Sequence, residues 1–135
     1  MSYLLDTNAV IAVIKDTPGV RRRLRRAMAS RQPVSVSAIA AYELWYGVAR
    51  SARRRENSQR LRAFLSGAIR VLGFDEEDAS VAGDLRARLE GLGTPIGPYD
   101  LLIAGQALRT GLTLVTANIR EFSRVPDLVW EDWTA

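Results

Sequence analysis

The segment at residues 1–15 constrains the fold more than any other part of the chain. A short apolar run, Tyr3–Leu5, ends at the carboxylate of Asp6, and an apolar run typical of a helix follows at residues 9–14. This pattern predicts a buried strand that leads almost directly into a helix. A carboxylate at the end of a buried strand is expensive to desolvate. Because open α/β sheets build their sites at that edge, Asp6 is the first candidate for a functional residue.

The rest of the chain alternates strand-like and helix-like patterns. Further strands are predicted at residues 33–37, 69–74, 112–116 and 128–130. Helices are predicted at residues 20–30, 38–50, a stretch through Leu61, 75–92 and 99–109, with a loop or helical turn at 118–122. Thr17 and Ser37 are the expected N-caps of the first two of these helices. This alternation is typical of an α/β sandwich with a mostly parallel sheet of four to five strands. At 135 residues, the chain is expected to form one domain over residues 1–135.

The composition removes several kinds of chemistry. The chain has no Cys and no His, which excludes thiolate chemistry, the Ser-His-Asp triad and an ordinary zinc site. Hydrolysis would depend on carboxylates, hydroxyls, arginines, the single Lys15, and a metal ion. No run approaches the roughly 20 apolar residues of a membrane span, and no secretion signal is recognisable. The expected location is therefore the cytoplasm, without a membrane partner.

Four acids stand apart from the solvated charges: Asp6, Glu43, Asp100 and Glu121. If the first and fourth predicted strands are parallel neighbours, Asp6 and residues 116–121 emerge at the same sheet edge. Helices packed near that edge could bring in Glu43 and Asp100. Each acid alone also has a structural explanation: Asp6 could cap the next helix, and Asp100 would gain about 0.3–1 kcal/mol in a first helical turn. Taken together, the four favour a shared site.

Such a cluster of acids cannot remain ionised without a counter-charge. Two carboxylates about 4 Å apart repel each other by about 4 kcal/mol at an effective dielectric near 20. Either some of them are protonated or a divalent cation binds. Oxygen ligands without His or Cys select a hard ion, Mg²⁺, with Mn²⁺ as the alternative. A carboxylate-held Mg²⁺ with open water positions is suited to phosphodiester hydrolysis.

The sequence also resembles a known family over nearly its whole length. The motifs are LLDTN at Leu4–Asn8, SAIAAYELWYG at Ser37–Gly47, IGPYDLLIAG at Ile96–Gly105 and LVTANIREFSRVPDLVWEDW at Leu114–Trp133. They are similar to the motifs of PIN-domain ribonucleases, and most of all to the VapC toxins of bacterial VapBC toxin–antitoxin pairs. The resemblance implies a PIN-like three-layer α/β/α sandwich and an Mg²⁺-dependent endoribonuclease.

The same resemblance assigns roles to individual residues. Asp6 and Asp100 would be the principal metal ligands, Glu43 would complete the site directly or through water, and Glu121 would be the fourth acid. Polar support would come from Asn8, Thr116 and Asn118. Some members carry an Asp nearer the strand end, where this chain has Asn118, so either Glu121 or Asn118 completes the site. The family further implies a homodimer, a VapB-like antitoxin partner and a transfer-RNA substrate.

Other readings of the same residues remain open. The arginine runs at residues 21–26 and 50–62 could follow an RNA backbone or be solvated faces. Trp45 and Tyr46 could stack on a base, line an antitoxin groove or belong to the core. The acids at residues 75–78 are better explained by a helix dipole than by a metal.

Two alternative functions also remain. One is a small phosphatase with Asp6 as nucleophile. Such an enzyme needs a second acid two residues further on, and this chain has Asn8 there. The other is a non-catalytic binding module stabilised by a metal ion.

Overall fold

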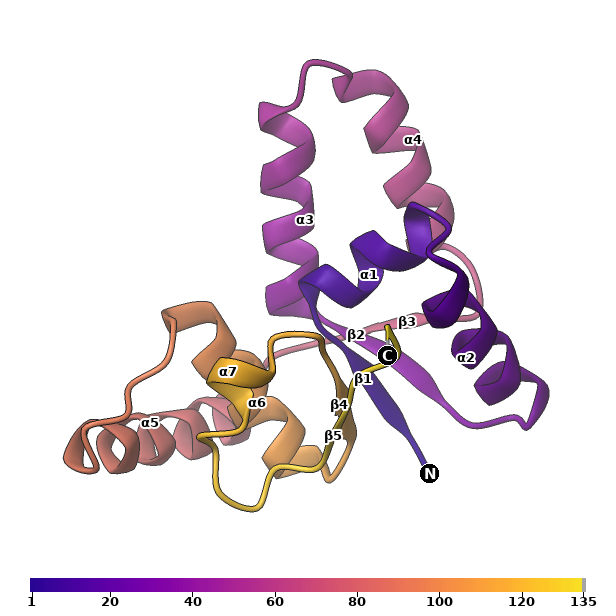
Figure 1. Cartoon of the computed structure of the whole chain (residues 1–135). Helices are drawn as coiled ribbons and strands as arrows, with labels where there is room; N and C mark the ends of the chain where they lie inside the picture. Colours follow the sequence, from indigo (N-terminus) through magenta and orange to yellow (C-terminus); the bar gives the residue numbers. More distant parts are fainter. Residues whose placement is uncertain (135) are drawn as a thin grey trace.

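A five-stranded parallel sheet forms the centre of the computed structural model, which describes residues 1–134 (Figure 1). The strands lie in the order β3-β2-β1-β4-β5, and every neighbouring pair is parallel. In the register, Leu5 of the central strand lies opposite Val36 on one side and Val115 on the other. The strands are β1 (Tyr3–Leu5), β2 (Val34–Ser37), β3 (Arg70–Leu72), β4 (Thr113–Val115) and β5 (Trp130–Glu131).

Helices cover both faces of the sheet. The first four pack together on one side, and the remaining three lie on the other (Figure 1). The three-layer α/β/α sandwich is therefore confirmed, with five strands that are all parallel. The helices are α1 (Thr7–Ile14), α2 (Pro18–Ala29), α3 (Ala38–Arg50), α4 (Arg54–Leu65), α5 (Glu76–Gly91), α6 (Pro98–Thr110) and α7 (Ile119–Phe122).

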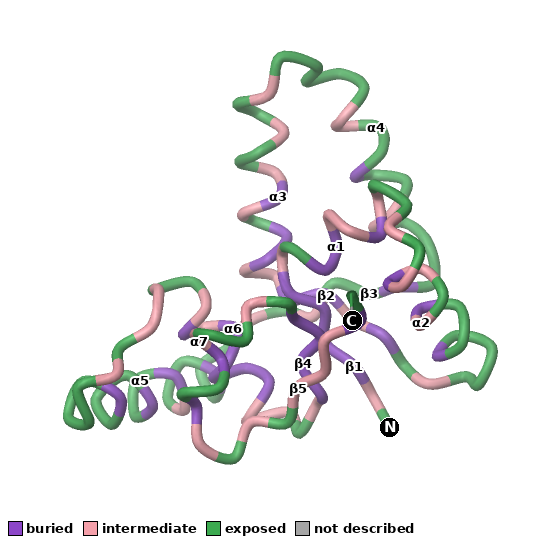
Figure 2. Tube along the Cα trace, viewed as in Figure 1, coloured by how far each residue is buried: buried purple, intermediate pink, exposed green. Residues whose placement is uncertain are grey.

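The central strand β1 and its neighbour β4 are buried along their whole length. Leu4, Leu5 and Leu114 have no exposed surface, as expected for strands covered by helices on both faces (Figure 2). Burial decreases outward along the α3–α4 hairpin, which projects from the body of the molecule and is largely exposed toward its tip. The sheet thus supplies a rigid base, and the hairpin supplies a surface that reaches away from it.

Local chemistry explains where several helices begin. The Asp6 carboxylate accepts a hydrogen bond from the Ala9 amide at 2.8 Å and so caps α1. The predicted Ser37 cap of α3 is confirmed, since its hydroxyl accepts from the Ile39 amide at 3.1 Å. Pro98 occupies the first turn of α6, where the lack of an N–H costs nothing.

Three sequence expectations need correction. The last strand was predicted at residues 128–130 but lies at Trp130–Glu131. The apolar Val129, which suggested an earlier start, is largely exposed and precedes the strand. Thr17 precedes α2 but makes no side-chain capping bond. Asp78, expected among solvated first-turn acids, is fully buried: it completes a capping box with Asp75 and accepts from Arg109 Nε at 2.7 Å.

The C-terminal segment packs back onto α2 and β1. The Trp133 ring is buried and meets Tyr3 edge to face, with ring centroids 5.1 Å apart. Arg23 of α2 lies 5.9 Å from the centre of the Trp133 ring and forms an ion pair with Glu131 at 3.0 Å. Of the helices within residues 1–134, none combines the length and apolar character needed to cross a membrane.

Candidate functional site

The sheet topology creates one position where polar groups can gather. The chain first adds β2 and β3 on one side of β1, and later adds β4 and β5 on the other side. The order therefore reverses between β1 and β4, and ligands of open α/β sheets bind outside the carboxyl ends of the strands at such a point. The predicted parallel pairing of these two strands is confirmed, and Asp6 and Thr116 directly follow their ends.

Asp6 is buried at the centre of this edge. Only 4% of its surface is exposed, and burial raises the pKa of its carboxyl above the ordinary value. Hydrogen bonds from Thr116 and from the Ala9 amide oppose that rise, whereas the charges of Glu43 and Asp132 add to it. Asp6 is thus both the cap of α1 and a member of a group of carboxylates.

Glu43 reaches the edge from α3. Its carboxylate Oε1 accepts a hydrogen bond from Thr7 Oγ1 at 2.7 Å, which links the first turn of α1 to the first half of α3. Glu43 is partly buried and does not extend into open solvent. Its negative charge contributes to the raised pKa values of both Asp6 and Asp100. Thr7 is therefore a positioning residue that the sequence patterns did not single out.

Asp100 and Glu121 form a pair joined by Asn118. One amide nitrogen, Asn118 Nδ2, lies 3.1 Å from Asp100 Oδ2 and 3.1 Å from Glu121 Oε2. The Gly97 amide donates to Glu121 Oε1 at 3.0 Å. A Cβ atom on Gly97 would lie 3.7 Å from oxygens of both acids, so this backbone runs directly beside them.

The two carboxyls of this pair have shifted pKa values of opposite sign. Burial, the hydrogen bond to Glu121 and the neighbouring charges raise the pKa of Asp100 to about 7. The hydrogen bond with Asp100, together with those from the Gly97 and Asn118 groups, holds the pKa of Glu121 below its ordinary value despite burial. When the pair carries one proton, these opposite shifts favour its placement on Asp100.

The other predicted polar residues are placed less uniformly. Thr116 is buried, and its Oγ1 accepts from the Asn118 amide at 2.9 Å, which orients the turn after β4. Asn8 lies exposed in the first turn of α1, and its side chain takes no part in the hydrogen bonds that link the acids. The structure thus brings Thr116 and Asn118 to the four acids and leaves Asn8 at the surface.

Asp132 is a further acid that the sequence analysis missed. Its charge acts on Asp6, and it directly follows β5, just as Asp6 directly follows β1. The last strand was predicted at residues 128–130, which left Asp132 too far from a strand end to be noticed. The signal was present, since the carboxyl ends of parallel strands share one edge.

The donor set fits a hard divalent cation that keeps much of its water. All the charged donors are carboxylates. Burial, with a smaller part from neighbouring carboxylates, raises the pKa values of Asp6 and Asp100, so a bound cation would favour their ionised forms. Within residues 1–134, no three Asp or Glu side chains converge as a ready metal cage. Mg²⁺ is typically held in this way, by one or two carboxylates with the remaining positions filled by water.

Comparison with known proteins assigns the chain to a class. The model of the PIN domain family matches residues 3–128. The chain therefore belongs to the PIN-domain family and is a nuclease.

Relatives place it more narrowly within that family. It is 38% identical over 133 residues to Ribonuclease VapC2 of Rickettsia felis, covering 98% of each chain. It is 40% identical over 133 residues to the tRNA(fMet)-specific endonuclease VapC of Salmonella typhimurium, again covering 98% of each. The crystal structure of VapBC2 from Rickettsia felis bound to a promoter DNA fragment aligns with a TM-score of 0.92 and 37% identity, covering 98% of this chain and 99% of that chain. Within the PIN-domain family, the chain is of the VapC ribonuclease type.

Proposed function

We propose that this chain is the toxin of a toxin–antitoxin pair and hydrolyses RNA phosphodiester bonds with Mg²⁺ at the acidic edge of its sheet. The observation that carries the proposal is the gathering of carboxyls from separate elements at one edge, where burial and the neighbouring carboxylates together raise the pKa of Asp100 to about 7. A structural role does not require such crowding, because each acid alone could be satisfied elsewhere at lower electrostatic cost.

The proposed metal ligands are Asp6 and Asp100, with Mn²⁺ as an alternative ion. When bound, the ion would make water more acidic and so a better nucleophile, and would stabilise negative charge on the phosphate. Asp6 is held for this role by the α1 backbone and Thr116, and Asp100 by Asn118. Loss of the Asp100 proton would accompany binding, because a ligating carboxylate must be ionised.

The remaining groups position and complete this pair. Glu43, fixed by Thr7 at 2.7 Å, completes the site directly or through water. Glu121 is ionised and held by the Gly97 amide, so it adds negative charge without taking the proton that Asp100 carries. We assign Asn118 a supporting role, since its amide donates to both acids instead of adding a further charge. Asn8, exposed on α1, is the weakest member of the predicted set.

Substrate and partners follow from the relatives. The Salmonella typhimurium relative is a tRNA(fMet)-specific endonuclease, and we infer a transfer-RNA substrate for this chain. The Rickettsia felis relative was crystallised as VapBC2, and we infer a VapB-like antitoxin partner that blocks the site. We further propose one PIN domain over residues 1–135, a homodimer, and action in the cytoplasm, where RNA and antitoxin would be met.

Cleavage of RNA by the purified chain tests this function. Mixed transfer RNA incubated with the protein and Mg²⁺ should be cut, and chelation of the metal should stop cleavage. Asp100→Asn should slow cleavage by on the order of 100-fold or more, because charge stabilisation at the reacting phosphate is lost. Asp84→Asn, which removes an exposed acid of α5, is the matched control and should cleave as the wild type does. Unchanged cleavage by Asp100→Asn would contradict the proposed site.

A further inference from the structure

Three exposed tyrosines surround a groove beside the acidic site. Tyr42 and Tyr46 lie on α3 with 54% and 55% of their surfaces exposed, and Tyr99 lies in the first turn of α6 with 41% exposed. The groove encloses about 460 Å³ and is lined by these tyrosines together with Thr7 and Glu43. It therefore shares a wall with the proposed catalytic centre.

The tyrosines form a continuous surface. The rings of Tyr42 and Tyr99 are tilted by 59° with centroids 5.6 Å apart, and their hydroxyls are 3.5 Å apart. Tyr42, Tyr46 and Arg50 are spaced four residues apart on α3, so they share one face and rise by about 6 Å per step. Arg50 lies 5.6 Å from the Tyr46 ring centre and donates to the Tyr46 hydroxyl at 3.3 Å. We call Tyr99, Tyr42, Tyr46 and Arg50 the tyrosine track.

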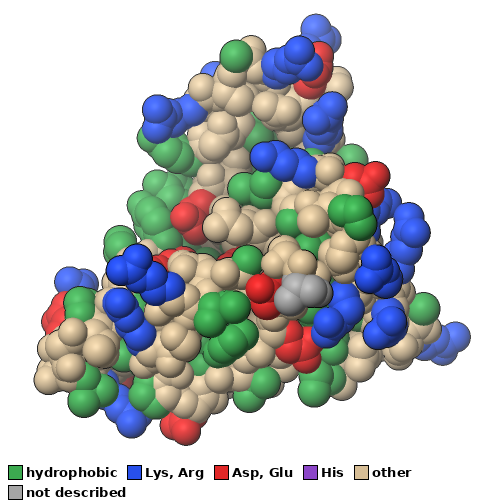
Figure 3. All heavy atoms as spheres, in the orientation of Figure 1, with side chains coloured by type: hydrophobic (Ala, Val, Ile, Leu, Met, Phe, Trp, Pro, Cys, Tyr) green, Lys and Arg blue, Asp and Glu red, His purple; other side chains and the backbone are tan. Residues whose placement is uncertain are grey.

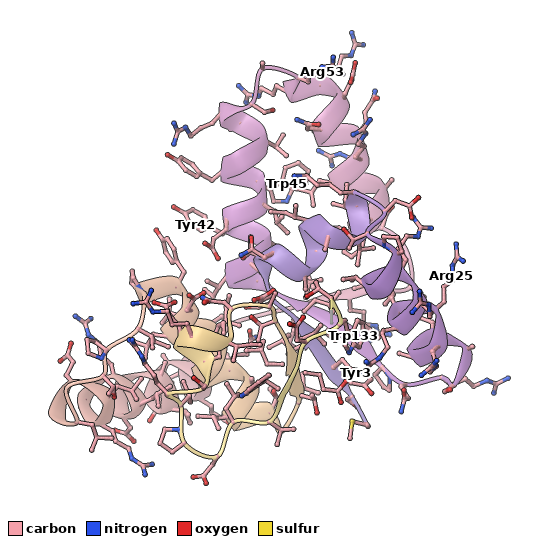
Figure 4. All side chains as sticks on the ribbon, viewed as in Figure 1. Tyr3, Arg25, Tyr42, Trp45, Arg53 and Trp133 are labelled. Carbon is pink, nitrogen blue, oxygen red and sulfur yellow. The ribbon has the colours of Figure 1, made fainter. Side chains whose placement is uncertain are left out.

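The track runs from the acids toward a basic tip. In Figure 3, hydrophobic side chains line the outer edge of the α3 arm, with acidic side chains beside them and Lys or Arg side chains above. Arg53 lies at the tip of the hairpin (Figure 4), and Arg54 and Arg55 follow it, all exposed. The surface thus changes from acidic to aromatic to basic along α3 toward the tip of the α3–α4 hairpin.

The aromatic residues of α3 are divided between two roles. Trp45 points toward α4 whereas Tyr42 points away from it (Figure 4), and Arg62 of α4 lies 5.3 Å from the centre of the Trp45 ring. Packing of α3 against α4 therefore explains Trp45. It does not explain Tyr42, Tyr46 or Tyr99, which are grouped and exposed at the mouth of the site, as expected of a surface that meets a ligand.

Aromatic faces next to arginines match one chemical partner. Unpaired bases of RNA stack on aromatic side chains, while phosphates pair with arginines, whose planar groups suit phosphate. In a duplex the base faces are already stacked and unavailable. We propose that the tyrosine track binds unpaired nucleotides of the RNA next to the cleaved bond, with bases on the tyrosine rings and a phosphate at Arg50. This inference rests on the proposed function, because it takes RNA as the substrate.

Binding measured without cleavage tests the track. The protein carries Asp100→Asn, and the probe is a fluorescent, unstructured 10-nucleotide RNA followed by anisotropy, with a duplex of the same sequence for comparison. Tyr42→Ala and Tyr46→Ala should each weaken binding by on the order of ten-fold, as loss of one stacked base does. Tyr42→Phe and Tyr46→Phe should bind normally, since the ring remains. Leu92→Ala, which trims an exposed apolar side chain at the C-cap of α5, should have no effect.

Salt dependence tests the arginine separately. If Arg50 pairs with one phosphate, Arg50→Ala should reduce the slope of log K against log salt by about 0.7, the value for single strands. Arg25→Ala removes another exposed arginine, on α2 and away from the track (Figure 4), and should leave the slope unchanged.

Several results would overturn the track. One is normal RNA binding by Tyr42→Ala, and another is equal affinity for duplex and single-stranded RNA. A third is a change in the subunit number of the tyrosine variants in sedimentation, because that result would assign this face to contact with a second copy of the chain. Failure of the proposed function looks different: the wild type would bind RNA through the track and yet not cleave it with Mg²⁺.

Discussion

A single amide, that of Asn118, controls the charge balance of the acidic site. Its Nδ2 donates to Asp100 and to Glu121 at 3.1 Å each, and it holds the two carboxyls close without adding charge. The hydrogen bond with Asp100 and, to a smaller extent, those from the Gly97 and Asn118 amides lower the pKa of Glu121, which favours its ionised form and protonation of Asp100. A neutral donor at this position makes the metal-free site tolerable.

Replacement of that donor by a charge should separate stability from metal binding. Asn118→Asp removes both donated hydrogen bonds and adds a carboxylate beside two others, so the metal-free protein should lose about 1–3 kcal/mol of unfolding free energy. Stabilisation by Mg²⁺ should increase, because the ion gains an anionic ligand. Thermal unfolding with and without Mg²⁺ measures both effects.

The control for this substitution makes the same chemical change elsewhere. Gln32→Glu, in the loop that leads into β2, also replaces an amide by a carboxylate, but does so at the amino ends of the strands, opposite the edge that carries the acids. It should leave the Mg²⁺ effect unaltered. Equal Mg²⁺ stabilisation of Asn118→Asp and the wild type would argue against a metal beside Asn118.

At the scale of elements, α5 and α6 depend on an unusually close approach. A Cβ atom on Gly105 would lie 2.7 Å from Ala82 Cβ and 2.8 Å from Ala82 Cα, distances that a real Cβ does not tolerate. The same interface holds an ion pair between Arg109, which is partly exposed, and the buried Asp78, with 2.7 Å between Nε and Oδ1. Although burial opposes ionisation, Arg109 and the Asp75 amide lower the pKa of Asp78. Since Asp100 lies in the first turn of α6, the packing of α6 against α5 also sets where that acid lies.

Two glycine substitutions distinguish close packing from simple helix propensity. Gly105→Ala should destabilise the protein by about 1–3 kcal/mol, because the added methyl overpacks the interface. Gly83→Ala on α5 meets nothing within 4 Å and should be neutral or stabilise by up to about 1 kcal/mol, since alanine favours a helix. Denaturant unfolding of both variants provides the measurement. A Gly105→Ala protein as stable as the wild type would mean that α5 and α6 can move apart enough to accommodate the methyl group at no cost in stability.

Sequence patterns predicted the elements well where one face is consistently apolar. The runs Tyr3–Leu5 and Thr113–Val115 are strands, as predicted, because burial on both faces imposes a continuous apolar pattern. The acids at residues 75–78 do lie at the start of a helix, as predicted, but the burial of Asp78 was not predicted, because it depends on Arg109, a partner 31 residues away. Long-range pairing of this kind leaves no local periodicity.

The candidate site shows the same division at the level of the whole molecule. Its sheet-edge members, Asp6 and Thr116, follow from the strand ends and from the parallel pairing of β1 and β4. The contact of Thr7 with Glu43 could not be predicted, because it depends on how α3 packs against α1. The tyrosine track was not predicted as a unit either, since Tyr99 meets Tyr42 only through the approach of α6 to α3. Spacing along the chain carries no information on such crossings.

Stability of the whole molecule should depend on pH in a direction set by Asp100. In the unfolded chain this carboxyl has an ordinary pKa of 3.8, whereas in the metal-free folded protein its pKa is about 7. Between these values the folded state binds more protons, so the unfolding free energy should fall as pH rises from about 4 to 7 and then level off. The raised pKa of Asp6 acts in the same direction. The lowered pKa of Glu121 stabilises the fold above its unfolded value of 4.5, and that contribution is lost only at lower pH.

Bound Mg²⁺ should make the unfolding free energy rise with pH instead of falling. The absence of histidine makes this change easier to assign to Asp100. With no His in the chain, no side chain of ordinary pKa titrates between pH 5 and 8. Mg²⁺ at about 100 times its Kd should add about 2.7 kcal/mol near pH 8 and much less at pH 5, where a protonated Asp100 cannot ligate. Thermal unfolding from pH 4.5 to 8, with and without Mg²⁺, measures both slopes. Asp100→Asn should flatten them and Asp84→Asn should not. A metal-free protein that instead becomes more stable from pH 5 to 7 would mean that Asp100 is ionised without a counter-ion, and the electrostatic basis of the metal site would be lost.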